Sequence, residues 1–200
     1  MSEWGMTKNK TPLQIVSGPL TNKCLIAAPD VTNMLFASSV VYICEHSDAG
    51  TTGIIINKPS SISFQEVLSQ LKIPSKSLNN DYPKVLWGGP EEQIRGFILH
   101  SADYSGFETK SVTEDISLTA SIDVVDEIAK GNGPKERLLA LGYSHWDAGR
   151  IEVEISANLW FVMDSDKDFL FNCPPAFKWK KALSMIGIDP LMLSLDQGSV

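Results

Sequence analysis

SSVVYICEHSDAGTTGIIINKP, residues 38–59, is the stretch that decides the fold of this 200-residue chain. Residues 40–44 and 54–56 are short apolar runs rich in β-branched side chains, which is typical of buried strands. Neither run alternates with polar residues, so we expect both faces of the two strands to be covered, with helices packed over a sheet. A polar loop that contains Gly50 and Gly53 is predicted to join them.

The flanking sequence adds helices and further strands. Ser63 and Glu66 form a capping box ahead of a predicted helix, and Ser121 is predicted to cap a second helix that ends at Gly131. Pro175 opens a last helix. Residues 151–155 alternate apolar and acidic side chains, which is typical of a strand, but Ile151 and Ile155 would also share one face of a helix. Strands are also predicted at 24–28, 85–87, 96–100, 115–119, 138–143, 160–163 and 169–171.

The order of these elements predicts one mixed α+β domain, because helices and strands alternate without a regular rhythm and no internal repeat is present. We expect the domain to cover residues 13–190, with a disordered N-terminal segment at 1–12 and a loose C-terminal tail at 191–200. No charged-then-apolar segment opens the chain and no apolar run is long enough for a bilayer. A cytoplasmic protein without membrane contact is therefore expected.

The composition argues against direct binding to nucleic acid. The chain has 17 Lys and Arg against 24 Asp and Glu, a formal net charge of −7, and a sequence pI near 4.9. A nucleic-acid binder usually concentrates positive charge on one face. The one dense basic cluster is Lys178, Lys180 and Lys181. Three widely spaced cysteines predict neither a disulfide framework nor a zinc site, which fits a reducing compartment.

Polar residues gather where the two central strands are predicted to end. Glu45 and His46 follow the first strand, and Asn57 and Lys58 follow the second. A carboxylate beside an imidazole can do acid–base chemistry, but neighbours in a strand face opposite ways unless the chain bends. The structural alternative is that Glu45 caps loop amides and His46 is a buried, hydrogen-bonded side chain. Lys58 is either an anion-binding group or an exposed lysine before the rigid Pro59.

The remaining candidates lie beside other predicted strands. Gly88-Gly89 lacks the Gly-Lys-Ser/Thr ending of a phosphate loop and fits a tight structural turn. The guanidinium of Arg95 is a candidate group for binding a carboxylate or phosphate through two hydrogen bonds. Tyr143 and Trp146 either line a ligand cleft or pack in the core. The spacing of the three histidines supports no metal site, and no cofactor is expected. The candidate cleft residues are Glu45, His46, Asn57, Lys58, Gly88, Gly89, Arg95, His100, Tyr143 and Trp146.

The chain resembles the AlgH/YqgE family nearly end to end. The resemblance rests on GPL…CLIAAP (18–29), VVYICEH…GIIINKP (40–59), VLWGGP…RGFILH (85–100), SLTAS.DV (117–124) and LALGYSHW..GRIEVEI..NLW (139–160), in that order. It implies a small bacterial cytosolic protein whose branched, mixed β-sheet closes in part into a small barrel and is surrounded by helices. It also implies a helix over 149–157. The chain departs from the family pattern at Glu91-Glu92, Ser144-His145 and Arg150.

The resemblance carries over no catalytic residue, because none is established for the family, whose name reflects a proposed regulatory role in alginate synthesis. Our leading hypothesis is a non-enzymatic regulatory or interaction protein that acts on transcription indirectly and senses a small ligand in a cleft at the hairpin ends. The alternative is a small hydrolase with Glu45 or His46 as base and Lys58 or Arg95 as anion clamp. The expected partner is an unknown protein or a small ligand, and the expected state is a monomer or weak homodimer.

Overall fold

The computed structural model describes residues 19–74 and 82–188. The predicted disordered segment at 1–12 and the tail at 191–200 lie outside these ranges. The described strands are β1 (Lys23–Ala27), β2 (Val40–Ser47), β3 (Gly50–Ile55), β4 (Val85–Trp87), β5 (Glu91–Ser101), β6 (Thr109–Ser111), β7 (Ile116–Thr119), β8 (Arg137–Asp147) and β9 (Trp160–Asp164). The helices are α1 (Phe64–Leu71), α2 (Ile122–Lys130), α3 (Arg150–Ser156), a π-helix (Asp168–Asn172) and α4 (Pro175–Met185).

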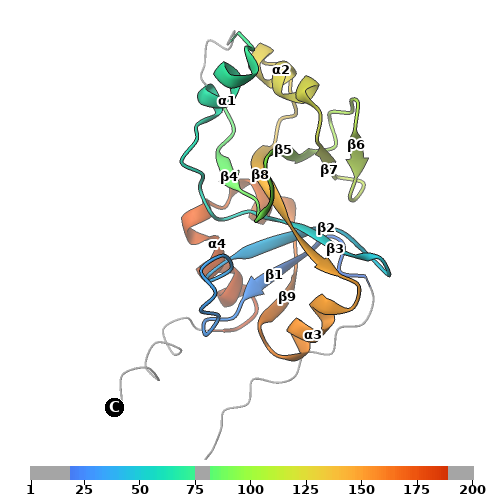
Figure 1. Cartoon of the computed structure of the whole chain (residues 1–200), viewed down its shortest axis with the longest axis vertical. Coiled ribbons are helices and arrows are strands. Elements are labelled where there is room, and N and C mark those ends of the chain that lie inside the picture. Colours follow the sequence, from blue (N-terminus) through green and yellow to red (C-terminus); the bar gives the residue numbers. More distant parts are fainter. Residues whose placement is uncertain (1–18, 75–81, 189–200) are drawn as a thin grey trace, which may run out of the picture.

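The strands form one curled, mostly antiparallel sheet in the order β6-β7-β5-β8-β3-β2-β1-β9. β4 is a branch that pairs in parallel with β8. Helices α1 and α2 lie at one end of the molecule and α3 and α4 at the other, and β8 runs between the two ends (Figure 1). The predicted mixed α+β domain with a branched, half-barrel sheet is therefore confirmed. No helix in the described ranges is long and apolar enough to cross a bilayer.

The central strands are covered on both faces, as their uninterrupted apolar runs predict. Val40 and Tyr42 face the main core, which also takes up Leu183 of α4. Val41 and Ile43 face a second core on the other side of the sheet, which is built with side chains of α3 and two tryptophans. Alternate side chains of β2 thus bury against different helices, α4 on one face of the sheet and α3 on the other.

Strand β8 changes partners along its length. Residues 137–141 pair with β4 and β5, whereas 144–147 pair with β3. Gly142 lies between the two parts with φ +77°, and a Cβ atom there would lie 2.6 Å from the Gly89 carbonyl oxygen. A Cβ atom on Gly88 would lie 2.2 Å from the Gly142 carbonyl oxygen. Gly88, Gly89 and Gly142 therefore form a backbone contact that we call the glycine junction.

The loop between the central strands is shorter than predicted, and this prediction is wrong. β2 continues to Ser47 and β3 begins at Gly50, so only Asp48 and Ala49 remain in the turn. Gly53 lies within β3, where a Cβ atom would come within 2.7 Å of the Val41 side chain. Its small size serves close packing and not a turn, and the neighbouring threonines extend the ladder because β-branched residues suit a pleated strand.

The predicted helices are found at their expected positions. Ser63 and Glu66 form the capping box of α1, with the Ser63 amide donating to Glu66 Oε2 at 2.6 Å. Gly131 ends α2 in the left-handed conformation. Ser121 precedes α2, but its side chain makes no capping hydrogen bond, so that part of the prediction is wrong. Residues 150–156 are helical, as the family resemblance implies.

The strand predicted at 169–171 is wrong, because these residues belong to the π-helix. Its apolar residues Phe169 and Leu170 are buried, which accounts for the strand-like run. Lys178 of α4 is fully buried and donates from Nζ to the carbonyl oxygens of Phe169, Leu170 and Cys173 at 2.9, 2.8 and 2.6 Å. The lysine thus satisfies carbonyls at the end of the π-helix, and it does not belong to a basic surface patch.

The burial of Lys178 predicts a pH-dependent effect on stability. Burial lowers the pKa of Lys178 to about 8 from 10.5. Between pH 8 and pH 10.5, Lys178 is protonated in a smaller fraction of the folded molecules than of the unfolded ones. The contribution of this group to the free energy of unfolding therefore rises with pH. We expect Lys178→Met to destabilise the fold at pH 7, because three carbonyls lose their donor. The deficit should then grow by about 2 kcal/mol between pH 8 and pH 10, at about 1.36 kcal/mol per pKa unit.

Urea unfolding of wild type and variant across this pH range measures the effect. Lys180→Met is the matched control, because Lys180 is exposed on the same helix and is not among the charges that shift the pKa of Lys178, and its deficit should stay constant. A Lys178→Met deficit that does not change between pH 8 and pH 10 contradicts the account.

Candidate functional site

A cleft of about 820 Å³ borders the main core, and Cys44, Phe97, Leu118, Ala120 and Tyr143 supply its apolar floor. The same residues belong to the main core or pack against it. The cleft is therefore the place where the inner face of the curled sheet continues beyond the core and becomes accessible to solvent. Its remaining lining is polar and comes from two sides, the β2–β3–β8 side and the β5–β6 side.

On the β2–β3–β8 side, a β-bulge decides which residues face the cleft. The β2–β3 register shifts between Ile43 and Glu45. Cys44 and Glu45 consequently both line the cleft, although they are neighbours. Glu45 is paired with Thr52 of β3, which is paired with His145 of β8, so these three side chains form one cross-strand row that lines the cleft. A bulge re-aims side chains in this way because it adds one residue to the alternation.

The same bulge turns His46 away from the cleft. His46 Nδ1 lies 2.8 Å from Thr51 Oγ1, and its Nε2 lies 3.4 Å from Glu152 Oε1 of α3. The imidazole thus connects the hairpin to the helix on the opposite face of the sheet. Glu45 and His46 do not share a cleft, and the expectation that extended neighbours face opposite ways holds here.

The β5–β6 side is built from two irregular backbone segments. The register between β5 and β8 shifts between Glu91 and Gly96, so Glu92 and Arg95 lie in a bulge. Glu92 has φ +42° and Glu108, just before β6, has φ +57°, a conformation that few residues other than glycine adopt. Both glutamates line the cleft. Strained backbone that positions charged side chains in a cavity is a feature of functional sites.

Glu92 holds two other residues of the cleft in place. Arg95 Nη1 donates to Glu92 Oε2 at 3.2 Å, and the Tyr143 hydroxyl donates to Glu92 Oε1 at 3.3 Å. The Arg95 guanidinium also lies over the Phe97 ring, 5.2 Å from its centroid. These contacts pair the positive charge of Arg95 with the negative charge of Glu92 against the aromatic floor.

Three charged residues of the cleft have no such partner. Glu45, Glu108 and Lys110 line the cleft, and the side chain of none of them makes a hydrogen bond or ion pair with the residues that the structure describes. All three are exposed, so their charges are available to a ligand. The lining thus offers unpaired groups of both signs.

Several residues predicted to line the site have structural roles elsewhere. Asn57 Oδ1 accepts from the Val40 amide at 2.7 Å, and its Nδ2 donates to the Ser38 carbonyl at 2.8 Å. Lys58 Nζ donates to the carbonyl oxygens of Leu35 at 2.7 Å and Met34 at 3.3 Å, and burial lowers the pKa of Lys58. Neither residue lines the cleft.

The two remaining predicted residues, His100 and Trp146, are buried. His100 Nδ1 donates to the Ser101 carbonyl at 2.8 Å and Nε2 lies 2.8 Å from Thr119 Oγ1, while burial lowers the pKa of His100. Trp146 donates to Glu154 Oε2 at 3.0 Å in the second core. Both are interior groups with satisfied hydrogen bonds.

Of the ten residues predicted to line the cleft, the structure brings only some together. Glu45, Arg95 and Tyr143 meet in the cleft, and Gly88 and Gly89 belong to the glycine junction beside it. Of the four residues of the hydrolase alternative, Glu45 and Arg95 line the cleft, whereas Lys58 and His46 are engaged elsewhere. The sequence did not predict the other charged or hydroxyl-bearing cleft residues, which are Thr21, Thr52, Glu92, Glu108, Lys110, Ser111 and His145.

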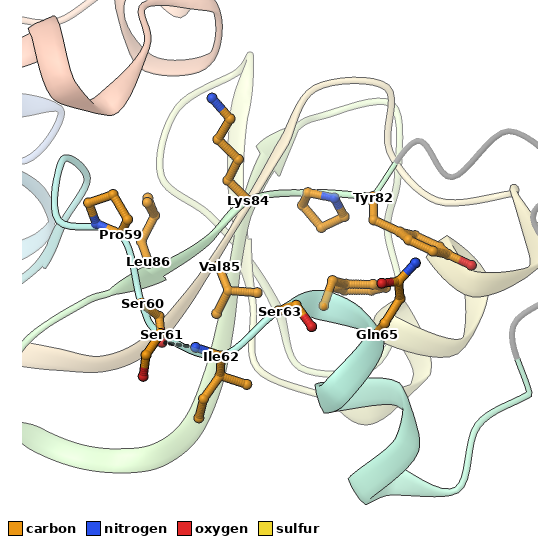
Figure 2. A pocket seen from close by; sticks show the side chains of 12 residues that line it. Pro59, Ser60, Ser61, Ile62, Ser63, Gln65, Tyr82, Lys84, Val85 and Leu86 are labelled. Carbon is orange, nitrogen blue, oxygen red and sulfur yellow. Dashed lines mark hydrogen bonds between the residues drawn. The ribbon is translucent and has the colours of Figure 1, made fainter.

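A second hollow, of about 420 Å³, lies between residues 59–65 and 82–86 (Figure 2). Its lining is mostly serine, proline and aliphatic side chains, with the rings of Phe64 and Tyr82 stacked at 5.1 Å. Lys84 is its one charged lining residue, and Figure 2 shows its side chain pointing away from Ser61 and Ile62. This hollow offers little to orient a polar ligand, so the cleft is the better candidate. No group of three or more metal-binding side chains occurs in the part of the chain described.

Comparison with known proteins assigns the family. A family model described as AlgH-like matches residues 24–191. The chain belongs to the AlgH-like family. A UPF0301 protein of Ruegeria pomeroyi is 42% identical over 180 residues, which cover 90% of this chain and 98% of the relative. A UPF0301 protein of Rhodospirillum rubrum is 39% identical over 189 residues, covering 94% of this chain and 98% of the relative.

Two solved structures have the same architecture. The solution structure of AlgH from Pseudomonas aeruginosa aligns with a TM-score of 0.75 at 34% identity, over 94% of this chain and 97% of that one. A crystal structure of a Corynebacterium diphtheriae protein, at 20% identity, aligns with a TM-score of 0.68 over 91% of this chain and 93% of that one, and supports the fold alone. The family resemblance found in the sequence is confirmed.

The environment of Tyr143 gives a test of the cleft geometry. Burial and the neighbouring Glu92 carboxylate raise the pKa of Tyr143. We expect Glu92→Gln to move this pKa back toward its ordinary value, because the amide keeps the shape and removes the charge. A pH titration followed by NMR of the tyrosine ring carbons resolves the four tyrosines. Glu108→Gln is the control and should leave the Tyr143 pKa unchanged. An unchanged pKa in Glu92→Gln contradicts the contact.

Proposed function

We propose that this AlgH-like protein is a non-catalytic binding protein that takes a small polar ligand in the cleft and acts through a protein partner. The observation that carries the proposal is a concave site with an apolar floor and unpaired charges of both signs at its sides. Small-molecule sites combine these features, since the floor supplies contact area and a few polar groups fix orientation.

A regulatory role without direct DNA contact follows as part of the proposal. The net charge of −7 opposes association with phosphate backbones. Lys178 is also buried, which removes it from the one dense basic cluster of the sequence. We propose that the protein is cytoplasmic and that a ligand-dependent contact with another protein transmits the signal to transcription.

A second candidate function is hydrolysis with His145 as the base. His145 Nδ1 lies 3.4 Å from Thr52 Oγ1 in the cleft, and its Nε2 lies 3.8 Å from Asp147 Oδ1. This order of hydroxyl, imidazole and carboxylate matches that of a nucleophile, a base and an orienting acid. Both distances exceed the hydrogen-bond reach of about 2.6–3.2 Å that proton transfer needs, so this candidate ranks second.

Thermal unfolding against a panel of metabolites tests the binding proposal. A ligand at about 100 times its dissociation constant adds about 2.7 kcal/mol. For a domain of this size the midpoint should then rise by about 5–10 °C. Glu45→Gln and Lys110→Met should reduce the shift, because each removes an unpaired charge from the cleft. Lys84→Met, in the second hollow, is the matched control and should bind as wild type does.

Three outcomes decide between the candidates. A saturable shift that weakens only in the cleft variants supports binding. Turnover of a compound of the panel that is lost in His145→Ala and in Thr52→Val, with the fold intact, replaces the binding proposal by the hydrolase. No shift with any compound, or a shift that both cleft variants retain in full, overturns the proposal.

A further inference from the structure

We propose that the ligand of the cleft is a zwitterion whose amine and carboxylate lie at opposite ends of an extended molecule. This inference rests on the proposed function and specifies its ligand. Glu45 of β2 would take the amine, and Lys110 of β6 would take the carboxylate. The class comprises short peptides and ω-amino acids, which share this separation of charges.

Two of the unpaired charges, Glu45 and Lys110, come from opposite sides of the cleft. Glu45 and Lys110 line one cleft, yet they belong to strands that β3, β8, β5 and β7 separate in the sheet order. They make no ion pair with each other or with any described residue. A ligand that reaches both side chains therefore meets a negative group from β2 and a positive group from β6. A zwitterion with separated charges satisfies both.

A hydroxyl group lies next to each of these two charged residues. Thr52 lies directly across from Glu45 in the β2–β3 ladder and adds a hydroxyl that can accept from an ammonium group. Ser111 follows Lys110 and also lines the cleft, where its hydroxyl can donate to a carboxylate. Each end of the cleft thus provides a charged group and a hydroxyl, which suits a terminal ammonium at one end and a terminal carboxylate at the other.

The middle of the cleft suits the uncharged part of such a molecule. Phe97, Leu118 and Tyr143 supply apolar and aromatic contact along the floor. Arg95 is already paired with Glu92, so this part of the lining has no excess charge to attract a ligand group. The volume of about 820 Å³ is within the range of about 300–1,000 Å³ typical of small-molecule sites.

Glu108 offers a second unpaired carboxylate, on the same side of the cleft as Lys110. It lies two residues before Lys110 and does not pair with it. An amine bound at Glu108 would leave the Glu45 carboxylate unused and would place both ends of the ligand on one side. The variants Glu45→Gln and Glu108→Gln separate these two arrangements.

The test uses calorimetric titration of the full chain with triglycine and 6-aminohexanoate. Matched probes are N-acetyl-triglycine, which lacks the amine charge, and triglycine amide, which lacks the carboxylate. We expect Glu45→Gln and Lys110→Met each to weaken the binding of triglycine by about 10- to 100-fold, the range for a charged hydrogen bond. N-acetylation should cost as much in wild type and little more in Glu45→Gln, because both remove the same contact. Amidation of the triglycine carboxylate should weaken binding to wild type as much as Lys110→Met does, and should weaken binding to Lys110→Met little further.

The controls are Lys84→Met and the thermal midpoints of the unliganded variants, which should match wild type because Glu45 and Lys110 are exposed and unpaired. Binding of 6-aminohexanoate without triglycine assigns the ligand to the ω-amino acids, and the reverse assigns it to peptides. Loss of binding in Glu108→Gln but not in Glu45→Gln overturns the proposed orientation.

The failure of this inference can be told apart from the failure of the proposed function. If neither zwitterion binds, but another compound gives a thermal shift that depends on the cleft variants, the zwitterion is wrong and the cleft remains a binding site. If no compound binds, or if binding does not depend on any cleft variant, both proposals are overturned.

Discussion

The close contact between the backbones of Gly89 and Gly142 is the constraint on which the rest of the structure depends. β8 pairs with β4 and with the main part of β5 before Gly142, with Glu91 of β5 at Tyr143, and with β3 from Ser144 on, so the two parts of the sheet are joined around Gly142. A side chain at any of the three junction glycines would come within 2.6 Å of a backbone atom. The branched, curled shape of the sheet therefore requires residues without a Cβ atom at this point.

The cleft follows from the same irregularity. Opposite Gly142, the β5 strand carries extra residues, and this bulge brings Glu92 and Arg95 to the cleft. A second bulge, in β2, turns Glu45 toward the cleft and His46 toward α3. Ladder defects thus position the charged groups, while regular strands supply the apolar floor. A rigid floor with charged sides is suited to holding a small polar molecule without a large change of shape.

The sequence predicted those features that depend on local patterns, such as the capping box at Ser63, the end of α2 at Gly131 and the buried runs of β2 and β3. It did not predict the bulges, because they depend on the register of strands far apart in the chain. A shift of one residue exchanges the two faces, so Glu45 and His46 could not be assigned to a side. The π-helix was missed for a different reason: its buried residues Phe169 and Leu170 resemble a short strand, and its carbonyls are satisfied by the side chain of Lys178.

Comparison of Gly142→Ala with Gly149→Ala tests the glycine junction most directly. The two glycines have nearly the same φ, +77° and +75°, but a Cβ atom on Gly149 meets nothing within 4 Å. Both variants bear the cost of a left-handed alanine, about 1–2 kcal/mol. Measured by urea unfolding, Gly142→Ala should cost at least about 2 kcal/mol more, because its methyl group also collides with backbone. Equal losses in the two variants would contradict the account.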